Sequence, residues 1–245
     1  MMAQPEGLLM IDKPTRMTSH DVVQVVRRTL RIRRVGHTGT LDPMARGLLI
    51  ALVGRATTHQ RALQGHDKTY EAVLQLGIQT DTADGEGKSV RQKPVPTLTA
   101  GRIRDVLASF EGALTQIPPA YSAVKIRGRP SYWWTRRNQV VDRPSRTVQV
   151  RHLELLDHDA TTITFRTRCS AGTYVRTLAE SIAEQLGTVG HLASLVRRKI
   201  GEWSLEDAYP LSWIQQVDAS TLGAVLRPVA AQDHPDIEPV AHARS

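Results

Sequence analysis

Cysteine is almost absent from this 245-residue sequence, and its scarcity excludes two kinds of stabilising or functional site. Cys169 is the sole cysteine, so the chain cannot form an internal disulfide or a cysteine-based zinc cluster. Phenylalanine, tryptophan and tyrosine together make up 4% of the residues. Valine, leucine, isoleucine and alanine must therefore supply most of the core packing.

Long apolar runs are missing as well. No run approaches the roughly 20 residues that a membrane-spanning helix needs. The first seven residues lack the charged start and the apolar centre of a signal peptide. We therefore expect a soluble, cytoplasmic protein without membrane contact.

Acidic residues are also in deficit. Lysine and arginine number 32 against 24 aspartates and glutamates, which gives a formal net charge of +8. This balance favours a polyanionic partner, because binding to phosphates releases condensed counterions. Many basic proteins bind no nucleic acid, so the charge alone does not decide. An anionic membrane surface is the alternative, but no basic amphipathic helix with a strongly apolar opposite face stands out.

The pattern of apolar residues predicts strands and helices that mix without strict alternation, which favours an α+β fold. The 40% apolar content allows one large core, or a core with a small appendage. Thr18 and Ser19 offer oxygens that can cap the start of a helix. Strands are expected at residues 7–12, 47–54, 68–77, 147–156 and 161–169, and helices after residue 18, around 103–110 and from about Tyr174.

Residues 36–43, Gly-His-Thr-Gly-Thr-Leu-Asp-Pro, form the segment best suited to chemistry. Its glycines permit tight backbone paths, and Pro43 biases Asp42 toward extended geometry. A carboxylate held there can act as a nucleophile, a general base or a metal ligand. The alternative is an ordinary Asp-Pro turn. The segment lacks the ending of a P-loop, and His37 and Asp42 have no partner at metal-ligand spacing.

Tyr70 and Arg176 are two further candidates with plain alternatives. Tyr70 falls on the apolar face of the alternating strand, where an ordinary core tyrosine is the better explanation from the residues alone. Arg176 falls in the first turn of a helix, where the helix dipole disfavours a cation. Such an arginine could hold a nearby aspartate ionised and oriented, or it could simply be solvated.

Residues 126–146 mix cationic and aromatic side chains in what we interpret as an irregular segment. RNA recognition uses this combination, through phosphate pairing and base stacking. The alternative is a surface excursion with partly buried tryptophans. The residues concerned are Arg127, Arg129, Tyr132, Trp133, Trp134, Arg136, Arg137, Arg143 and Arg146.

Six blocks of sequence, in order from about residue 7 to residue 212, resemble the TruB family of tRNA pseudouridine synthases. The resemblance implies a pseudouridine synthase fold, with a mixed, mainly antiparallel central sheet, flanking helices and an RNA-gripping insertion at 126–146. The main blocks are 12–14 with 18–19, 36–43 with 47–49, 67–70, 77–82, 116–125 and 169–176.

The resemblance also implies a reaction and a site. The reaction is isomerisation of uridine 55 in the tRNA T-loop to pseudouridine, with the base flipped out, no cofactor and no metal. Asp42 would be the essential aspartate, Tyr70 the active-site tyrosine and Arg176 the partner of Asp42. His37 would lie where the extruded nucleotide leaves the T-loop stack. Tyr174 and Leu195 would line the base pocket, and Lys13 and Pro14 would support the bottom of the site.

Three features depart from the family pattern. Arg16 stands where glycine is usual, and Val196 interrupts a Leu-Arg-Arg pattern next to Leu195. From its length, we expect the chain to lack the usual full C-terminal PUA domain. We expect a catalytic domain over residues 7–229, a loose tail over 230–245 and a monomer that binds the tRNA T-arm without a protein partner.

Two other functions remain open at this point. One is an RNA-binding or tRNA-folding protein for which catalysis is incidental. The other is a carboxylate-dependent glycosidase, which would need a second acid, and Asp12 is the one nearby candidate. Three chemical paths of Asp42 also stay open: attack on the ribose C1′, attack on C6 of the base, or removal of a ribose proton.

Overall fold

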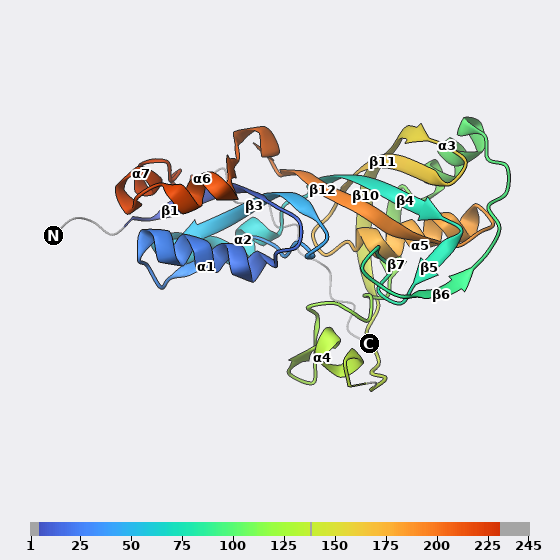
Figure 1. The fold of residues 1–245 in the computed structure, drawn as a ribbon, viewed down its shortest axis with the longest axis horizontal. Helices are drawn as coiled ribbons and strands as arrows, with labels where there is room; N and C mark the ends of the chain where they lie inside the picture. The colour runs from blue at the N-terminus through green and yellow to red at the C-terminus, as the bar shows by residue number, and fades with distance from the viewer. Residues whose placement is uncertain (1–4, 138, 231–245) are drawn as a thin grey trace. The chain divides into compact units, whose positions relative to one another are not determined.

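The computed structural model describes residues 5–137 and 139–230, which form two compact units (Figure 1). Among the described residues, the first unit consists of 5–67 and 199–230, and the second consists of 68–137 and 139–198. The predicted catalytic domain over 7–229 spans both units, and its boundaries stay a prediction. Beyond residue 230, the predicted tail lies outside the described residues.

The first unit contains a small sheet whose central strands are β1 and β3. They pair in antiparallel fashion, from Gly7 opposite Val53 to Lys13 opposite Gly47. Strand β14 joins β1 in parallel, and β2 joins β3 in antiparallel fashion. The elements of this unit are β1 (Gly7–Lys13), α1 (Ser19–Leu30), β2 (Val35–His37), β3 (Arg46–Val53), η1 (Gly54–His59), α2 (Gln60–Gln64), β13 (Trp203–Ser204), η2 (Leu205–Asp207), β14 (Tyr209–Pro210), α6 (Leu211–Gln216) and α7 (Ala219–Ala224).

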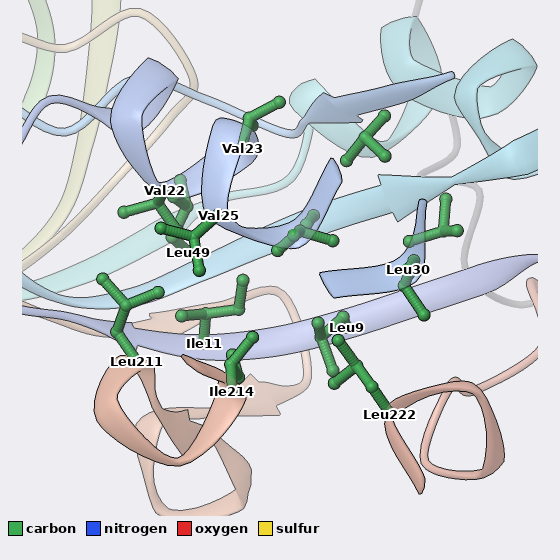
Figure 2. Close-up of a cluster of buried hydrophobic side chains, with 14 residues drawn as sticks. Leu9, Ile11, Val22, Val23, Val25, Leu30, Leu49, Leu211, Ile214 and Leu222 are labelled. Atoms are coloured by element: carbon green, nitrogen blue, oxygen red, sulfur yellow. The ribbon is translucent and has the colours of Figure 1, made fainter. Parts of the chain in front are cut away.

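Both faces of this sheet are covered, as the continuous apolar run at residues 47–54 predicts. Leu9 and Ile11 of β1 point to the face covered by α1, α6 and α7 (Figure 2). Leu8 and Met10 point to the opposite face, where they pack with Leu63 of α2. Each fully buried side chain of this kind contributes about 1.5–3 kcal/mol, so the two clusters hold β1 and β3 firmly in place.

Helix α1 begins where its capping residues predict. The Thr18 side chain accepts a hydrogen bond from the Asp21 N–H, and the Asp21 carboxylate accepts one from the Thr18 N–H at 2.9 Å. Val22 and Val26 then face the core, with no exposed surface. This reciprocal capping fixes the start of the helix directly beside the turn at residues 14–17.

The second unit is built on a mainly antiparallel sheet with strand order β12, β4, β11, β10, β7. Strand β4 alternates buried and half-buried residues along its full length, as its sequence predicts. The elements are β4 (Lys68–Leu76), β5 (Ile78–Thr80), β6 (Ser89–Gln92), α3 (Ala100–Ser109), β7 (Gly112–Gln116), β8 (Lys125–Ile126), β9 (Arg129–Pro130), α4 (Ser131–Thr135), β10 (Arg146–His158), β11 (Thr162–Cys169), α5 (Val175–Gln185) and β12 (Gly190–Ile200), whose last two residues belong to the first unit.

The basic segment at 126–146 is more ordered than the sequence suggested. We expected an irregular segment, and this is wrong for its first part. Strands β8 and β9 form a hairpin whose turn residues, Arg127 and Gly128, both have positive φ, and α4 follows at once. Such a two-residue turn matches the twist of a hairpin. The sequence gives little sign of it, because the strong turn signals are Asn-Gly and Asp-Gly and not Arg-Gly.

The α+β prediction with a mainly antiparallel sheet is confirmed. Helices α3 and α5 contact each other, and they pack on β10 and β4 respectively. Within the described residues, we find no helix with the length and apolar character required to cross a membrane.

Candidate functional site

The loop around Asp42 is held by backbone hydrogen bonds of the first unit. The Thr38 N–H donates to the carbonyl of Ile50 at 3.1 Å, which ties the start of the loop to β3. The Ala45 N–H donates to the carbonyl of Asp42 at 3.1 Å, so Asp42 opens a tight turn that leads into β3. The half-buried Asp42 therefore does lie in a turn, as the plain alternative proposed, and this turn fixes its backbone.

Ser19, the first residue of α1, holds the loop from the other side. Its buried hydroxyl accepts a hydrogen bond from the Leu41 N–H at 2.8 Å and donates one to the Leu41 carbonyl at 3.2 Å. The residue just before Asp42 is thus fixed to a capped helix. From the sequence Ser19 is recognisable as a capping residue only, because no local pattern connects it with Leu41.

The other predicted site residues of the first unit have structural contacts of their own. Lys13 is fully buried, and its ammonium group donates to the carbonyls of Pro14 and Met17 at 2.9 and 2.6 Å. These contacts shape the turn after β1, as expected of a supporting residue, whereas the Pro14 ring is exposed. His37 ends β2, and its Nδ1 accepts a hydrogen bond from the Gly39 N–H at 3.2 Å.

Arg176 is buried in the second unit, with 4% of its surface exposed, so the idea of a solvated arginine is wrong. Its Nη1 donates to the carbonyl of Thr82 at 2.9 Å, and its Nη2 donates to the carbonyl of Tyr121 at 2.9 Å. The carboxylate of Asp84 lies 3.5 Å from Nη1 and is itself buried. A buried charge needs such partners, which explains how a cation is tolerated at the start of α5.

Asp84 is a residue that the sequence analysis missed. Its Oδ1 accepts hydrogen bonds from the Thr82 hydroxyl at 2.6 Å and from the Glu86 N–H at 3.1 Å. The available signal was the dense polar turn at residues 80–87, which looked like an ordinary loop. Nothing in its spacing connected it with Arg176.

The remaining predicted residues of the second unit lie on its sheet and at the start of α5. Tyr70 is 8% exposed on the buried face of β4, and Leu195 is 6% exposed in β12. Tyr174 is the N-cap residue of α5, and the side chain of Gln116 bonds both its N–H and its carbonyl, at 3.0 and 3.3 Å. The guanidinium of Arg146 lies 5.5 Å from the Tyr174 ring centroid. Gln116 therefore fixes the backbone of Tyr174.

The structure describes the predicted site as two sets of residues. Lys13, Pro14, His37 and Asp42 belong to the first unit, whereas Tyr70, Tyr174, Arg176 and Leu195 belong to the second. Among the described residues, no three histidine, cysteine, aspartate or glutamate side chains gather as a metal site would require. What the two sets offer is a half-buried carboxylate on a fixed loop, and a buried arginine with two tyrosines.

The basic segment presents aromatic rings covered by arginines. The Arg137 guanidinium lies 3.7 Å from the ring centroid of Trp133, and Arg129 lies 5.5 Å from it. Trp134 donates its Nε1–H to the carbonyl of Ile126 at 3.0 Å. The tryptophans are half-buried, as the plain alternative expected, while Tyr132 is 40% exposed.

Comparison with known proteins gives consistent matches over most of the chain. The family model of the TruB family pseudouridylate synthases (N terminal domain) matches residues 27–175. The tRNA pseudouridine synthase B of Opitutus terrae is 43% identical over 224 residues, which cover 91% of this chain and 93% of that protein. The protein of the same name from Caldanaerobacter subterraneus subsp. tengcongensis is 42% identical over 212 residues, which cover 86% of this chain and 74% of that protein.

Solved structures agree with these matches. A chain in a Cbf5-Nop10-Gar1 complex is similar with a TM-score of 0.70 and 28% identity, and the match covers 93% of this chain and 61% of that chain. A chain in an archaeal box H/ACA sRNP Nop10-Cbf5 complex gives a TM-score of 0.64 and 28% identity, over 86% of this chain and 53% of that chain. This chain thus spans less than two thirds of either solved chain. It belongs to the TruB family of pseudouridylate synthases.

Proposed function

We propose that this protein isomerises uridine 55 in the T-loop of tRNA to pseudouridine, with Asp42 as the essential carboxylate. The observation that carries the proposal is the fixed, half-buried Asp42 on a loop tied to both α1 and β3. The curated relatives named tRNA pseudouridine synthase B support tRNA as the substrate.

The proposed reaction breaks the bond between C1′ of the ribose and N1 of the uracil, turns the base and joins C1′ to C5. The proton on C5 leaves and N1 gains one, so the isomerisation is balanced without an oxidant or a second substrate. A carboxylate can start it by attack on C1′ or C6, or by removing a ribose proton. These steps require neither a metal nor a nucleotide cofactor.

The other site residues have proposed roles that rest on their positions in the sequence. Tyr70 stacks on the base and assists proton transfer, and Arg176 pairs with Asp42. Tyr174 and Leu195 line the base pocket, and the fixed backbone of Tyr174 and the burial of Leu195 support this role. His37 lies where the extruded nucleotide leaves the stack.

The basic segment is proposed to grip the T-arm. Its exposed Tyr132 and its arginines suit base stacking and phosphate pairing. Gripping the RNA helps to offset the few kcal/mol lost when the target base leaves its stack. We propose that a monomer does this without a protein partner.

Replacing Asp42 by asparagine tests the assignment. The Asp42→Asn protein should bind a T-arm stem-loop normally, but its rate of tritium release from C5-tritiated uridine should fall by about 10³-fold or more. Asp105→Asn, which removes an exposed carboxylate on α3, is the matched control and should react like the wild type. If Asp42→Asn released tritium as fast as the wild type, Asp42 would not be the essential carboxylate.

A further inference from the structure

Arg16 occupies a backbone conformation that suits glycine better than arginine. Its φ is +64°, in the left-handed region that side chains with a Cβ disfavour. The Arg16 N–H donates to the carbonyl of Pro43 at 2.8 Å, so the strained turn is fastened to the residue that follows Asp42. The side chain of Arg16 is exposed. An arginine therefore stands beside Asp42 at a conformational cost.

Arg46 lies on the other side of the same turn. It begins β3 and is the sole exposed residue of that strand. Because Lys13 pairs with Gly47, the chain after β1 and the chain before β3 lie at the same end of this strand pair. The backbone of Arg16 is thus bonded to the short turn that begins at Asp42, and Arg46 directly follows this turn in the chain.

Neither guanidinium has an acidic partner among the residues that the structure describes. Neither makes a hydrogen bond or an ion pair with any residue in the described parts of the chain. The nearby carboxylate of Asp21 is occupied in capping α1, where it accepts hydrogen bonds from the N–H and the hydroxyl of Thr18. By contrast, exposed Arg55 in η1, just after the far end of β3, does have an acidic partner, Glu6 at 2.7 Å.

From these observations we propose that Arg16 and Arg46 bind the two RNA phosphates that flank the target nucleotide. The inference rests on the proposed function, because it takes the substrate to be RNA with one uridine turned toward Asp42. Such a nucleotide carries one phosphate on its 5′ side and one on its 3′ side. Arginine binds phosphate through paired N–H donors, and it keeps its charge throughout the working pH range.

Single substitutions measured by binding and kinetics test the charges. Arg16→Gln and Arg46→Gln should each weaken the Kd for a T-arm stem-loop by about three- to tenfold. Each should also lower the slope of log affinity against log salt by about 0.7–1. KM should rise with kcat unchanged, and Arg16→Lys should restore most of the affinity. Arg55→Gln is the matched control and should leave the affinity and the slope unchanged.

Arg16→Gly separates the loss of charge from damage to the fold. Glycine accepts a φ of +64° without strain, so this variant should melt at or above the wild-type temperature and still bind RNA as weakly as Arg16→Gln. A variant that bound weakly because it had unfolded would melt lower.

Modified RNA assigns the contacts to particular phosphates. A neutral methylphosphonate on the 5′ or 3′ side of the target uridine should weaken wild-type binding. The Arg16→Gln protein should bind one of the two modified RNAs as well as it binds unmodified RNA, because the contact to that phosphate is already lost. The Arg46→Gln protein should do the same with the other modified RNA. The inference is overturned if the losses simply add, or if both variants bind like Arg55→Gln. Wild-type protein that binds the unmodified stem-loop without forming pseudouridine would refute the proposed function instead, and protein that does neither would refute both.

Discussion

At the scale of single residues, Arg176 is a buried cation whose surroundings hold it in place. Two backbone carbonyls and the carboxylate of Asp84 surround its guanidinium. These partners hold the guanidinium in a fixed orientation. A cation fixed in this way loses little side-chain entropy when it meets a further anion.

Glu180, on the same helix as Arg176, gives a pH-dependent prediction. Burial raises the pKa of the Glu180 carboxyl, although a hydrogen bond from Gln79 at 3.0 Å opposes the rise. The neighbouring Glu184 raises this pKa further, and Arg176 lowers it. The folded protein therefore holds the proton more tightly than the unfolded chain does, and the stability from this group is lost as the pH rises from about 4.5.

Glu180→Gln should consequently melt slightly above the wild type at pH 7, and this advantage should shrink as the pH falls toward 4.5 and be largely gone below it. Melting temperatures measured by calorimetry between pH 4 and pH 8 would check it. Glu86→Gln, which alters an exposed carboxyl, should show no such trend. A constant difference for Glu180→Gln across this range would contradict the assigned pKa shift.

At the scale of elements, the turn at Asp42 depends on α1 through a single hydroxyl. Ser19 bonds both the N–H and the carbonyl of Leu41. Ser19→Ala leaves two buried polar groups without this partner, which costs about 1–3 kcal/mol. The melting temperature should fall by several degrees, and kcat should fall more than KM rises, because the loop that carries Asp42 is loosened.

Differential scanning calorimetry and tritium-release kinetics would test Ser19→Ala. Ser89→Ala, an exposed serine on β6, is the matched control and should change neither quantity. If Ser19→Ala melted lower but kept its kcat, the hydroxyl would stabilise the fold without positioning the Asp42 loop.

The elements also show what a sequence can predict and where it stops. Period-two alternation predicts β4, and the Thr18 cap with its helical valines predicts α1, because both signals are local. The bonds from Ser19 to Leu41 and from Arg176 to Thr82 join residues distant in the sequence, and no local pattern encodes them. Family motifs point to Asp42, Tyr70 and Arg176, but they name no supporting partners, so Asp84 and the role of Gln116 went unnoticed.

At the scale of the whole molecule, the positively charged side chains differ in the partners that they contact. Some arginines are neutralised, as Arg166 is by Glu71 at 2.9 Å and Glu154 at 3.2 Å. Others lie against aromatic rings, as Arg136 does on Tyr132 at 5.5 Å. A contact of that kind keeps the positive charge available to an anion. The net charge of +8 therefore favours RNA most where cations lack acidic partners.

Charge reversal at the two arginines that directly follow α4 tests this view of the whole molecule. The double substitution Arg136→Glu with Arg137→Glu should weaken T-arm binding by about tenfold or more, and lower the salt slope by about two. Arg91→Glu with Arg104→Glu changes the net charge by the same amount, at exposed positions on β6 and α3. If both pairs lower the affinity equally, the net charge of the protein determines binding and the basic segment makes no direct contact with the RNA. If only the first pair weakens binding, and the melting temperature is unchanged, the basic segment contacts the RNA directly. Long-range attraction alone would depend on the net charge and would respond equally to both pairs.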